Sequence, residues 1–127
     1  MEQLYTRWGR DLDPQNVLME YPRPLLKRGS YINLNGYWDY AFTKEFNKPE
    51  QYNGQILVPF SPEAVLSGVS RQLQPDEYLW YRRTFTLEKW TNQKTGRRLI
   101  LHFGAVDQAC VVYVNGQKAA RHTGGYL

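Results

Sequence analysis

Residues 37–43 read Tyr37-Trp38-Asp39-Tyr40-Ala41-Phe42-Thr43, and this stretch decides the fold class. Aromatic residues favour the pleated, half-buried surface of a β-sheet. The turn-forming run Asn33-Leu34-Asn35-Gly36 comes directly before it. We therefore predict a strand over residues 37–43. Because successive strand residues point to opposite faces, one face would hold Trp38, Tyr40 and Phe42, and the other Tyr37, Asp39 and Ala41.

Five further segments have the alternation or the β-rich composition of strands: residues 55–59, 78–87, 98–103, 110–114 and 117–122. Asn115-Gly116 lies between the last two segments and is a strong hairpin signal, because both residues tolerate positive φ. Six short strands without a long helix indicate an all-β, antiparallel sandwich or barrel.

The remaining segments are predicted as short or irregular. Ser61-Pro62-Glu63 has the residues of a helix start and Gly68 those of a helix end, which predicts about two helical turns over residues 61–68. Prolines within residues 1–30 disfavour helix and central strand. We predict two parts, an N-terminal extended segment over residues 1–30 that packs on the domain, and the β domain over residues 31–127. The side chains expected to anchor the first part are Trp8, Leu18, Met19 and Tyr21.

Composition limits the function classes. The 127 residues fit a single domain, and aromatic residues make up 15% of them, as on faces that bind sugars or nucleic acids. The net charge is +4, but the basic residues form scattered doublets, Lys27-Arg28, Arg82-Arg83 and Arg97-Arg98. Two adjacent strand residues point to opposite faces, so a doublet is not a patch. We expect no nucleic-acid partner and no membrane partner, and the lack of an apolar leader predicts a cytoplasmic location.

Few residues suggest chemistry. Cys110 is the single cysteine, so neither an internal disulfide nor a cysteine-based zinc site is expected. His102 and His122 lack metal-ligand spacing, and no phosphate-binding or dinucleotide-binding glycine motif is present, so we expect no metal and no cofactor. The carboxylates in or beside predicted loops are Glu63, Asp76, Glu77 and Asp107. A pair of them could face a cleft, although loop carboxylates are usually just solvated.

Ordered motifs run along nearly the whole chain. They begin with Trp8-Gly9, Asp13-Pro14, Tyr21-Pro22-Arg23-Pro24 and residues 34–40, and continue through residues 56–63 and 66–68. The clearest are Trp80-Tyr81-Arg82-Arg83-Thr84-Phe85, residues 101–107, Val112-Tyr113-Val114-Asn115-Gly116 and His122-Thr123-Gly124-Gly125-Tyr126. In this joint order the chain resembles the opening of family 2 glycoside hydrolases, particularly β-galactosidase-like members.

The resemblance implies an antiparallel jelly-roll β-sandwich, a galactose-binding-domain-like fold also called the sugar-binding domain, with its C-terminal strands missing from this sequence. In that family the domain precedes an immunoglobulin-like domain and a TIM barrel, and the barrel holds the catalytic glutamate pair of a retaining β-glycosidase. The chain has no Asn-Glu dipeptide of the kind that contains the family's acid/base glutamate. The resemblance therefore implies a non-catalytic accessory domain whose partners are those two domains, of either β-galactosidase or β-glucuronidase type.

Three functions stay open at this point: the accessory domain, a free-standing carbohydrate-binding module, and a purely structural β-sandwich. The candidate substrate-binding residues are Trp80, Arg82 and Tyr126, although packing and buried ion pairing are favoured over sugar contact within residues 80–83. A binding module would need an exposed aromatic platform, for which Trp8, Trp80, Trp90 and Tyr126 are the candidates. Missing strands would leave an unpaired sheet edge, which favours a homodimer.

Overall fold

The structure is a computed structural model that describes residues 4–23, 25–87 and 98–125. The chain divides into two compact units, Met1–Thr86 and Leu87–Leu127. Strands account for most of the regular structure, and the helices are a single turn each. The prediction of an all-β chain is confirmed. Within the residues described, no helix has the length and apolar character needed to cross a bilayer.

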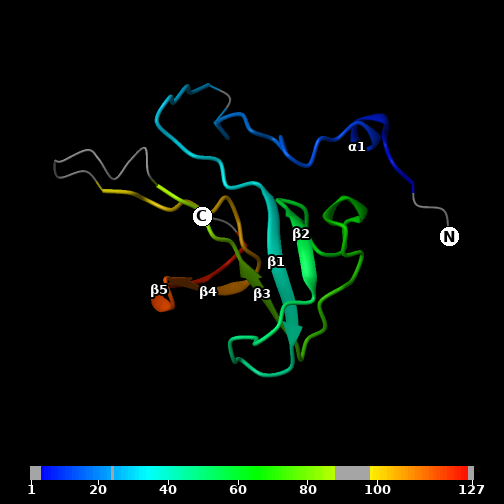
Figure 1. Ribbon diagram of the computed structural model, residues 1–127, viewed down its shortest axis with the longest axis vertical. Helices are drawn as coiled ribbons and strands as arrows, with labels where there is room; N and C mark the ends of the chain where they lie inside the picture. Colours follow the sequence, from blue (N-terminus) through cyan, green and yellow to red (C-terminus); the bar gives the residue numbers. More distant parts are fainter. Residues whose placement is uncertain (1–3, 24, 88–97, 126–127) are drawn as a thin grey trace. The chain divides into compact units, whose positions relative to one another are not determined.

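The first unit is built on a three-stranded antiparallel sheet of β1 (Gly36–Thr43), β2 (Gly54–Val58) and β3 (Tyr78–Arg82). Strand β1 lies in the middle, between β2 and β3 (Figure 1). Asp39 of β1 is opposite Gln55 of β2 and Arg82 of β3. The strands predicted over residues 37–43 and 55–59 are therefore confirmed. Tyr40 is opposite Gly54 and Tyr81. Because cross-strand partners share a face and neighbouring strand residues alternate, the predicted placement of Asp39 and Tyr40 on opposite faces is confirmed too.

Strand β3 is shorter than the predicted residues 78–87, because it ends at Arg82. Beyond that point the Arg83 guanidinium donates hydrogen bonds of 3.1 and 3.2 Å to the carbonyls of Asn35 and Tyr37. The Arg83 side chain thus occupies carbonyl acceptors at this end of β1, and the main-chain hydrogen bonds between β1 and β3 stop there.

The N-terminal segment is held to this sheet unit mainly through Val17, and of the predicted anchors only Tyr21 is half-buried, with its ring 5.1 Å from that of Tyr31. Val17 is 1% exposed, whereas Trp8 is 69% exposed and Leu18 and Met19 are also exposed. The Asn35 side-chain amide donates to the Val17 carbonyl, and that of Asn33 donates to the Leu18 carbonyl. The prediction for Trp8, Leu18 and Met19 is wrong, since backbone carbonyls and one small side chain make the attachment. A four-residue helix, α1 (Arg7–Arg10), is capped by the Thr6 side chain.

The helix predicted over residues 61–68 is reduced to a 3-10 turn, η1 (Val65–Ser67). Ala64 is extended, with φ −70° and ψ 136°, so Ser61 cannot cap a continuous helix. The buried Ser67 hydroxyl donates to the Ala64 carbonyl at 2.7 Å and accepts from the Val69 N–H. Such side-chain bonds compete with helical ones. Gly68 ends the turn in the left-handed conformation, as predicted.

The second unit contains the predicted hairpin, β4 (Ala109–Val114) and β5 (Gln117–Thr123). Asn115 and Gly116 have φ values of 50° and 80°, as the tight turn requires. The register shifts between Val112 and Tyr113, where β5 contains one extra residue.

The strand predicted over residues 98–103 is absent, because no strand of the described residues pairs with it. Its apolar side chains, Leu99, Ile100, Leu101 and Phe103, are exposed instead. An alternating pattern makes a segment able to form a strand, but main-chain hydrogen bonds form only when a neighbouring strand is available.

We predict that Ile56→Val lowers the free energy of unfolding by about 1 kcal/mol, because one buried methylene is lost from a tightly packed site. Ile56 is 0% exposed, and the matched control is Ile32→Val, which is 44% exposed and should change stability by less than about 0.5 kcal/mol. Urea denaturation measures both. Equal effects would show that β2 does not form the core.

Candidate functional site

Trp80 and Arg82 lie on the same face of the sheet, opposite Ala41 and Asp39 of β1. The Trp80 indole N–H donates to the Thr43 hydroxyl at 3.0 Å, and its ring lies 5.5 Å from that of Phe46. A tryptophan half-buried against a phenylalanine and bonded through its N–H is held by packing. Trp80 therefore contributes to the sheet's own structure.

Arg82 is held from two directions. Its Nε and Nη2 donate to Asp39 Oδ2 at 3.0 and 2.7 Å, and its guanidinium lies 4.1 Å from the centre of the Tyr52 ring. The hydrogen bond to the Asp39 carboxylate raises the pKa of Arg82. These contacts agree with the ion pairing favoured for residues 80–83, except that the pair is partly exposed.

A polar depression of about 270 Å³ surrounds this ion pair, and we call it the sheet depression. It is lined by Tyr37, Asp39, Gln55, Arg82, Arg83 and Thr84. Both arginines already have acceptors in the fold, Asp39 for Arg82 and two main-chain carbonyls for Arg83. The Asp39 carboxylate would also repel an anionic ligand. The charged side chains of the sheet depression thus mainly stabilise the fold and are little available to a ligand.

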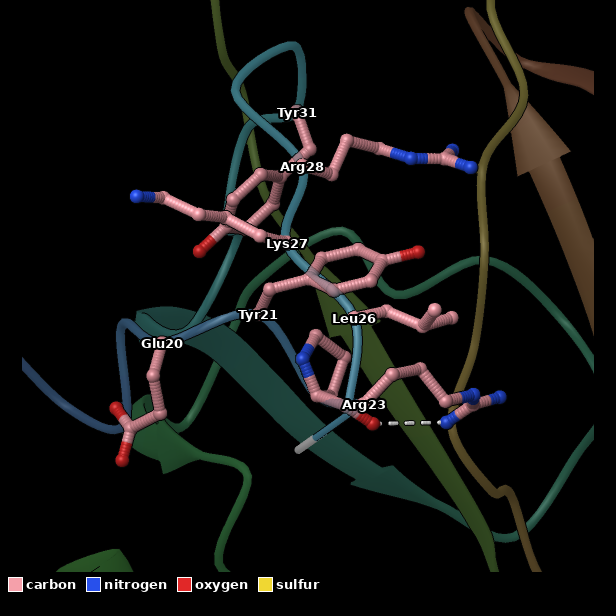
Figure 2. A pocket seen from close by; sticks show the side chains of 8 residues that line it. Glu20, Tyr21, Arg23, Leu26, Lys27, Arg28 and Tyr31 are labelled. Atoms are coloured by element: carbon pink, nitrogen blue, oxygen red, sulfur yellow. Dashed lines mark hydrogen bonds between the residues drawn. The ribbon is translucent and has the colours of Figure 1, made fainter.

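A larger hollow of about 660 Å³ lies in the loop of residues 20–31, and we call it the loop hollow (Figure 2). Its walls combine apolar side chains with three cations and one carboxylate: Glu20, Tyr21, Pro22, Arg23, Leu26, Lys27, Arg28 and Tyr31. The Tyr21 and Tyr31 rings meet edge to face, 5.1 Å apart, and the Arg28 guanidinium lies 5.5 Å from the centre of the Tyr21 ring. In Figure 2 the side chains of Arg23 and Arg28 extend to the side of Tyr21 and Leu26, and Lys27 extends to the other.

The loop hollow was not predicted from the sequence. Lys27-Arg28 was discounted by the rule that strand neighbours point apart, but these residues lie in a loop, where this rule does not apply. The usable signal was the gathering of Arg23, Lys27 and Arg28 between two tyrosines, Tyr21 and Tyr31. Of the other candidates, Tyr126 and Trp90 lie outside the described residues. Trp8 is exposed, and the Arg7 guanidinium lies 4.4 Å from the centre of its ring. The structure does not gather the predicted aromatics into a platform within the described residues.

The carboxylates Asp76 and Glu77 belong to an ion-pair cluster. Lys44 Nζ lies 2.8 Å from Asp76 Oδ2 and 3.6 Å from Glu77 Oε1, and Arg71 Nη2 lies 2.6 Å from Glu77 Oε1. The hydrogen bond from Lys44 holds the pKa of Asp76 below its ordinary value. The Glu77 side chain is 7% exposed, and its desolvation acts to raise its pKa. The Gln74 backbone N–H and Arg71 outweigh that effect, so the pKa of Glu77 is lowered as well.

This cluster lacks the electrostatics of a glycosidase acid. A general acid must keep its proton near neutral pH, which requires a raised carboxyl pKa. Both carboxylates here are stabilised in the ionised form. Among the residues described, no group of three His, Cys, Asp or Glu side chains is placed to hold a metal ion.

Comparisons with known proteins place this all-β chain beside carbohydrate-cleaving enzymes. No family model matches it. It is 34% identical over 125 aligned positions to the beta-glucuronidase of Felis catus, which covers 86% of this chain and 19% of that protein. It is 39% identical over 135 positions to that of Chlorocebus aethiops, covering 94% and 20%, and 27% identical over 117 positions to that of Paenibacillus borealis, covering 86% and 19%.

The chain therefore has homologues named beta-glucuronidase, which are family 2 glycoside hydrolases. The predicted relationship to glycoside hydrolases is confirmed at that level. The chain spans about a fifth of the length of the curated relatives it matches.

We predict that Glu77→Gln makes stability less sensitive to acid. Because the folded pKa of Glu77 lies below its ordinary value of 4.5, its ionised form stabilises the fold above that value, and this stabilisation is lost as the pH falls through the folded pKa. The variant should be less stable than the parent at pH 7, with the gap closing as the pH is lowered from 4.5 through the folded pKa of Glu77. Urea midpoints measured across the acid range test this.

The control is Glu50→Gln, which removes an exposed carboxylate that makes no ion pair with any described residue. Its curve should run parallel to that of the parent. A constant gap between Glu77→Gln and the parent at all pH values would contradict the role of ionisation.

Proposed function

We propose that this chain is the N-terminal, non-catalytic accessory domain of a retaining β-glycosidase of β-glucuronidase type. The observation that supports it is the asymmetry of the similarity, which covers 86% to 94% of this chain but only 19% to 20% of each relative. The relatives' name favours glucuronides over the β-galactosides suggested by the sequence motifs. Hydrolysis would proceed by double displacement with two carboxylates outside this chain.

A jelly-roll sandwich is the fold that we propose for the complete domain. Two features support it: the antiparallel sheet order β2-β1-β3, and a separate antiparallel hairpin later in the chain. Residues 98–103 would then form a strand once a neighbouring strand is supplied.

The ion-pair cluster supports a non-catalytic role. Asp76 and Glu77 were two of the four loop carboxylates that could have formed a catalytic pair. Both are neutralised by Lys44 and Arg71, and their lowered pKa values suit ion pairs and not proton donation. The free-standing binding module and the purely structural sandwich are the alternative functions.

The partners we propose are the immunoglobulin-like domain and the TIM barrel of the same polypeptide. In the described part of the second unit, Leu99, Ile100, Leu101 and Phe103 expose apolar surface in one short segment. Contiguous exposed apolar residues mark interaction surfaces. The occupant we assign is the following part of the polypeptide, because about four fifths of each relative's length lies outside the match.

We predict that the full protein encoded by the gene hydrolyses 4-nitrophenyl β-D-glucuronide with retention of configuration, and that residues 1–127 alone give no turnover above background. Product stereochemistry by NMR and release of nitrophenol measure this. A natural stop codon after Leu127, or turnover by the 127-residue chain, would refute the proposal.

We also predict that Leu101→Asp in the full protein lowers Tm by several degrees, because a charge would be buried at the proposed contact. The control is Leu4→Asp, an exposed leucine outside residues 98–103. It should shift Tm by less than about 2 °C. Identical shifts would mean that residues 98–103 do not pack against the following domains.

A further inference from the structure

The loop hollow contains cations that the fold does not neutralise. Arg23 and Arg28 form no ion pair with any carboxylate in the described residues. Arg23 uses one Nη1–H for the Pro22 carbonyl, and Arg28 donates no hydrogen bond within the same part of the chain. A guanidinium has five N–H donors, so most of them are available here. Arg82, by contrast, is already paired with Asp39.

The shape of the loop is fixed by contacts at its base. The Tyr31 hydroxyl donates to the Met19 carbonyl at 2.6 Å, and Asn33 holds the Leu18 carbonyl at 2.8 Å. The buried Val17 directly precedes Leu18 and Met19 in the sequence. Within the loop, the Leu26 N–H bonds to the Arg23 carbonyl at 2.9 Å. The cations are thus presented by a segment tied to the sheet unit, which reduces the entropy lost on binding.

Two features of the hollow define its ligand. Guanidinium groups bind carboxylates in a bidentate manner, more strongly than an ammonium does. The surrounding walls of Tyr21, Leu26 and Tyr31 require a ligand with C–H surface, which inorganic anions lack. A nucleic acid would need a longer track of cations than one loop provides. A sugar acid combines a carboxylate with an apolar ring face.

We propose that the loop hollow binds a carboxylated sugar, a uronate unit, through Arg23 and Arg28, with Tyr21 against the ring. The choice of a uronate among carboxylated sugars rests on the proposed function, while the preference for a carboxylate rests on the two arginines. Lys27 and Glu20 also line the hollow, but their side chains extend to the side opposite Arg23 and Arg28 (Figure 2), so we expect neither to contact the carboxylate.

The test is an NMR titration of the 15N-labelled full chain with a hyaluronan tetrasaccharide, which contains glucuronate. We expect saturable shifts at residues 20–31 with a dissociation constant of about 1 mM, weakened by added salt. Arg23→Gln and Arg28→Gln should each weaken binding about tenfold. The matched control, Lys27→Gln, should weaken it less than about twofold.

Three results would overturn the proposal: no saturable shift, equal shifts with the neutral tetrasaccharide of N-acetylglucosamine, or equal losses in all three variants, which would indicate unspecific charge attraction. Tighter, arginine-dependent binding of a single-stranded oligonucleotide would assign the hollow to nucleic acid instead. The spectra of the variants outside residues 20–31 report whether the fold is kept. Failure here together with glucuronide hydrolysis by the full protein would reject this site and leave the proposed function standing.

Discussion

The first unit depends on the junction at Asn35 and Gly36, where three separate segments meet. The Asn35 side-chain amide holds the Val17 carbonyl, and its own carbonyl accepts from Arg83 at the end of β3. Gly36 has a φ of 112°, and a Cβ there would lie 3.2 Å from Arg83 Nη1. Only glycine takes this backbone conformation without strain and lets the guanidinium approach so closely. The N-terminal segment, the start of β1 and the end of β3 are thus fixed by one short turn.

Sequence reasoning succeeded where the determinants are local. Strand β1 is specified by its own aromatic alternation, and the β4–β5 hairpin by Asn115-Gly116, whose positive φ values are intrinsic to those residue types. It failed where a distant partner decides. Residues 98–103 have a strand pattern, yet they form no ladder without a neighbouring strand. The helix start at Ser61 was overridden by the buried hydroxyl of Ser67.

The same distinction applies to the candidate sites. Trp80 and Arg82 were identified from a strand motif. The structure shows why packing and ion pairing suit them, since the Trp80 indole bonds to Thr43 of β1 and Arg82 pairs with Asp39 of the same strand. The gathering of cations in the loop hollow is visible in the sequence, but its shape could not be foreseen, because that shape depends on contacts of Tyr31 and Asn33 with the segment beside the buried Val17. A cation's role is set by its neighbours. Arg82 has a carboxylate partner and stabilises the fold, while Arg28 has a tyrosine ring beside it and no carboxylate partner among the described residues.

Burial in the described residues connects the fold to the proposed role. The fully buried apolar side chains are Val17, Ala41, Ile56 and Leu57, all in the first unit. The hairpin unit buries none, and every residue of β5 is exposed. A two-stranded ribbon has little stability of its own in water, since it needs further strands or a packed face. The apolar residues 99–101 supply such a face without a partner in the described residues. A unit with this distribution would gain stability from a partner that packs against it, as the proposed accessory role requires.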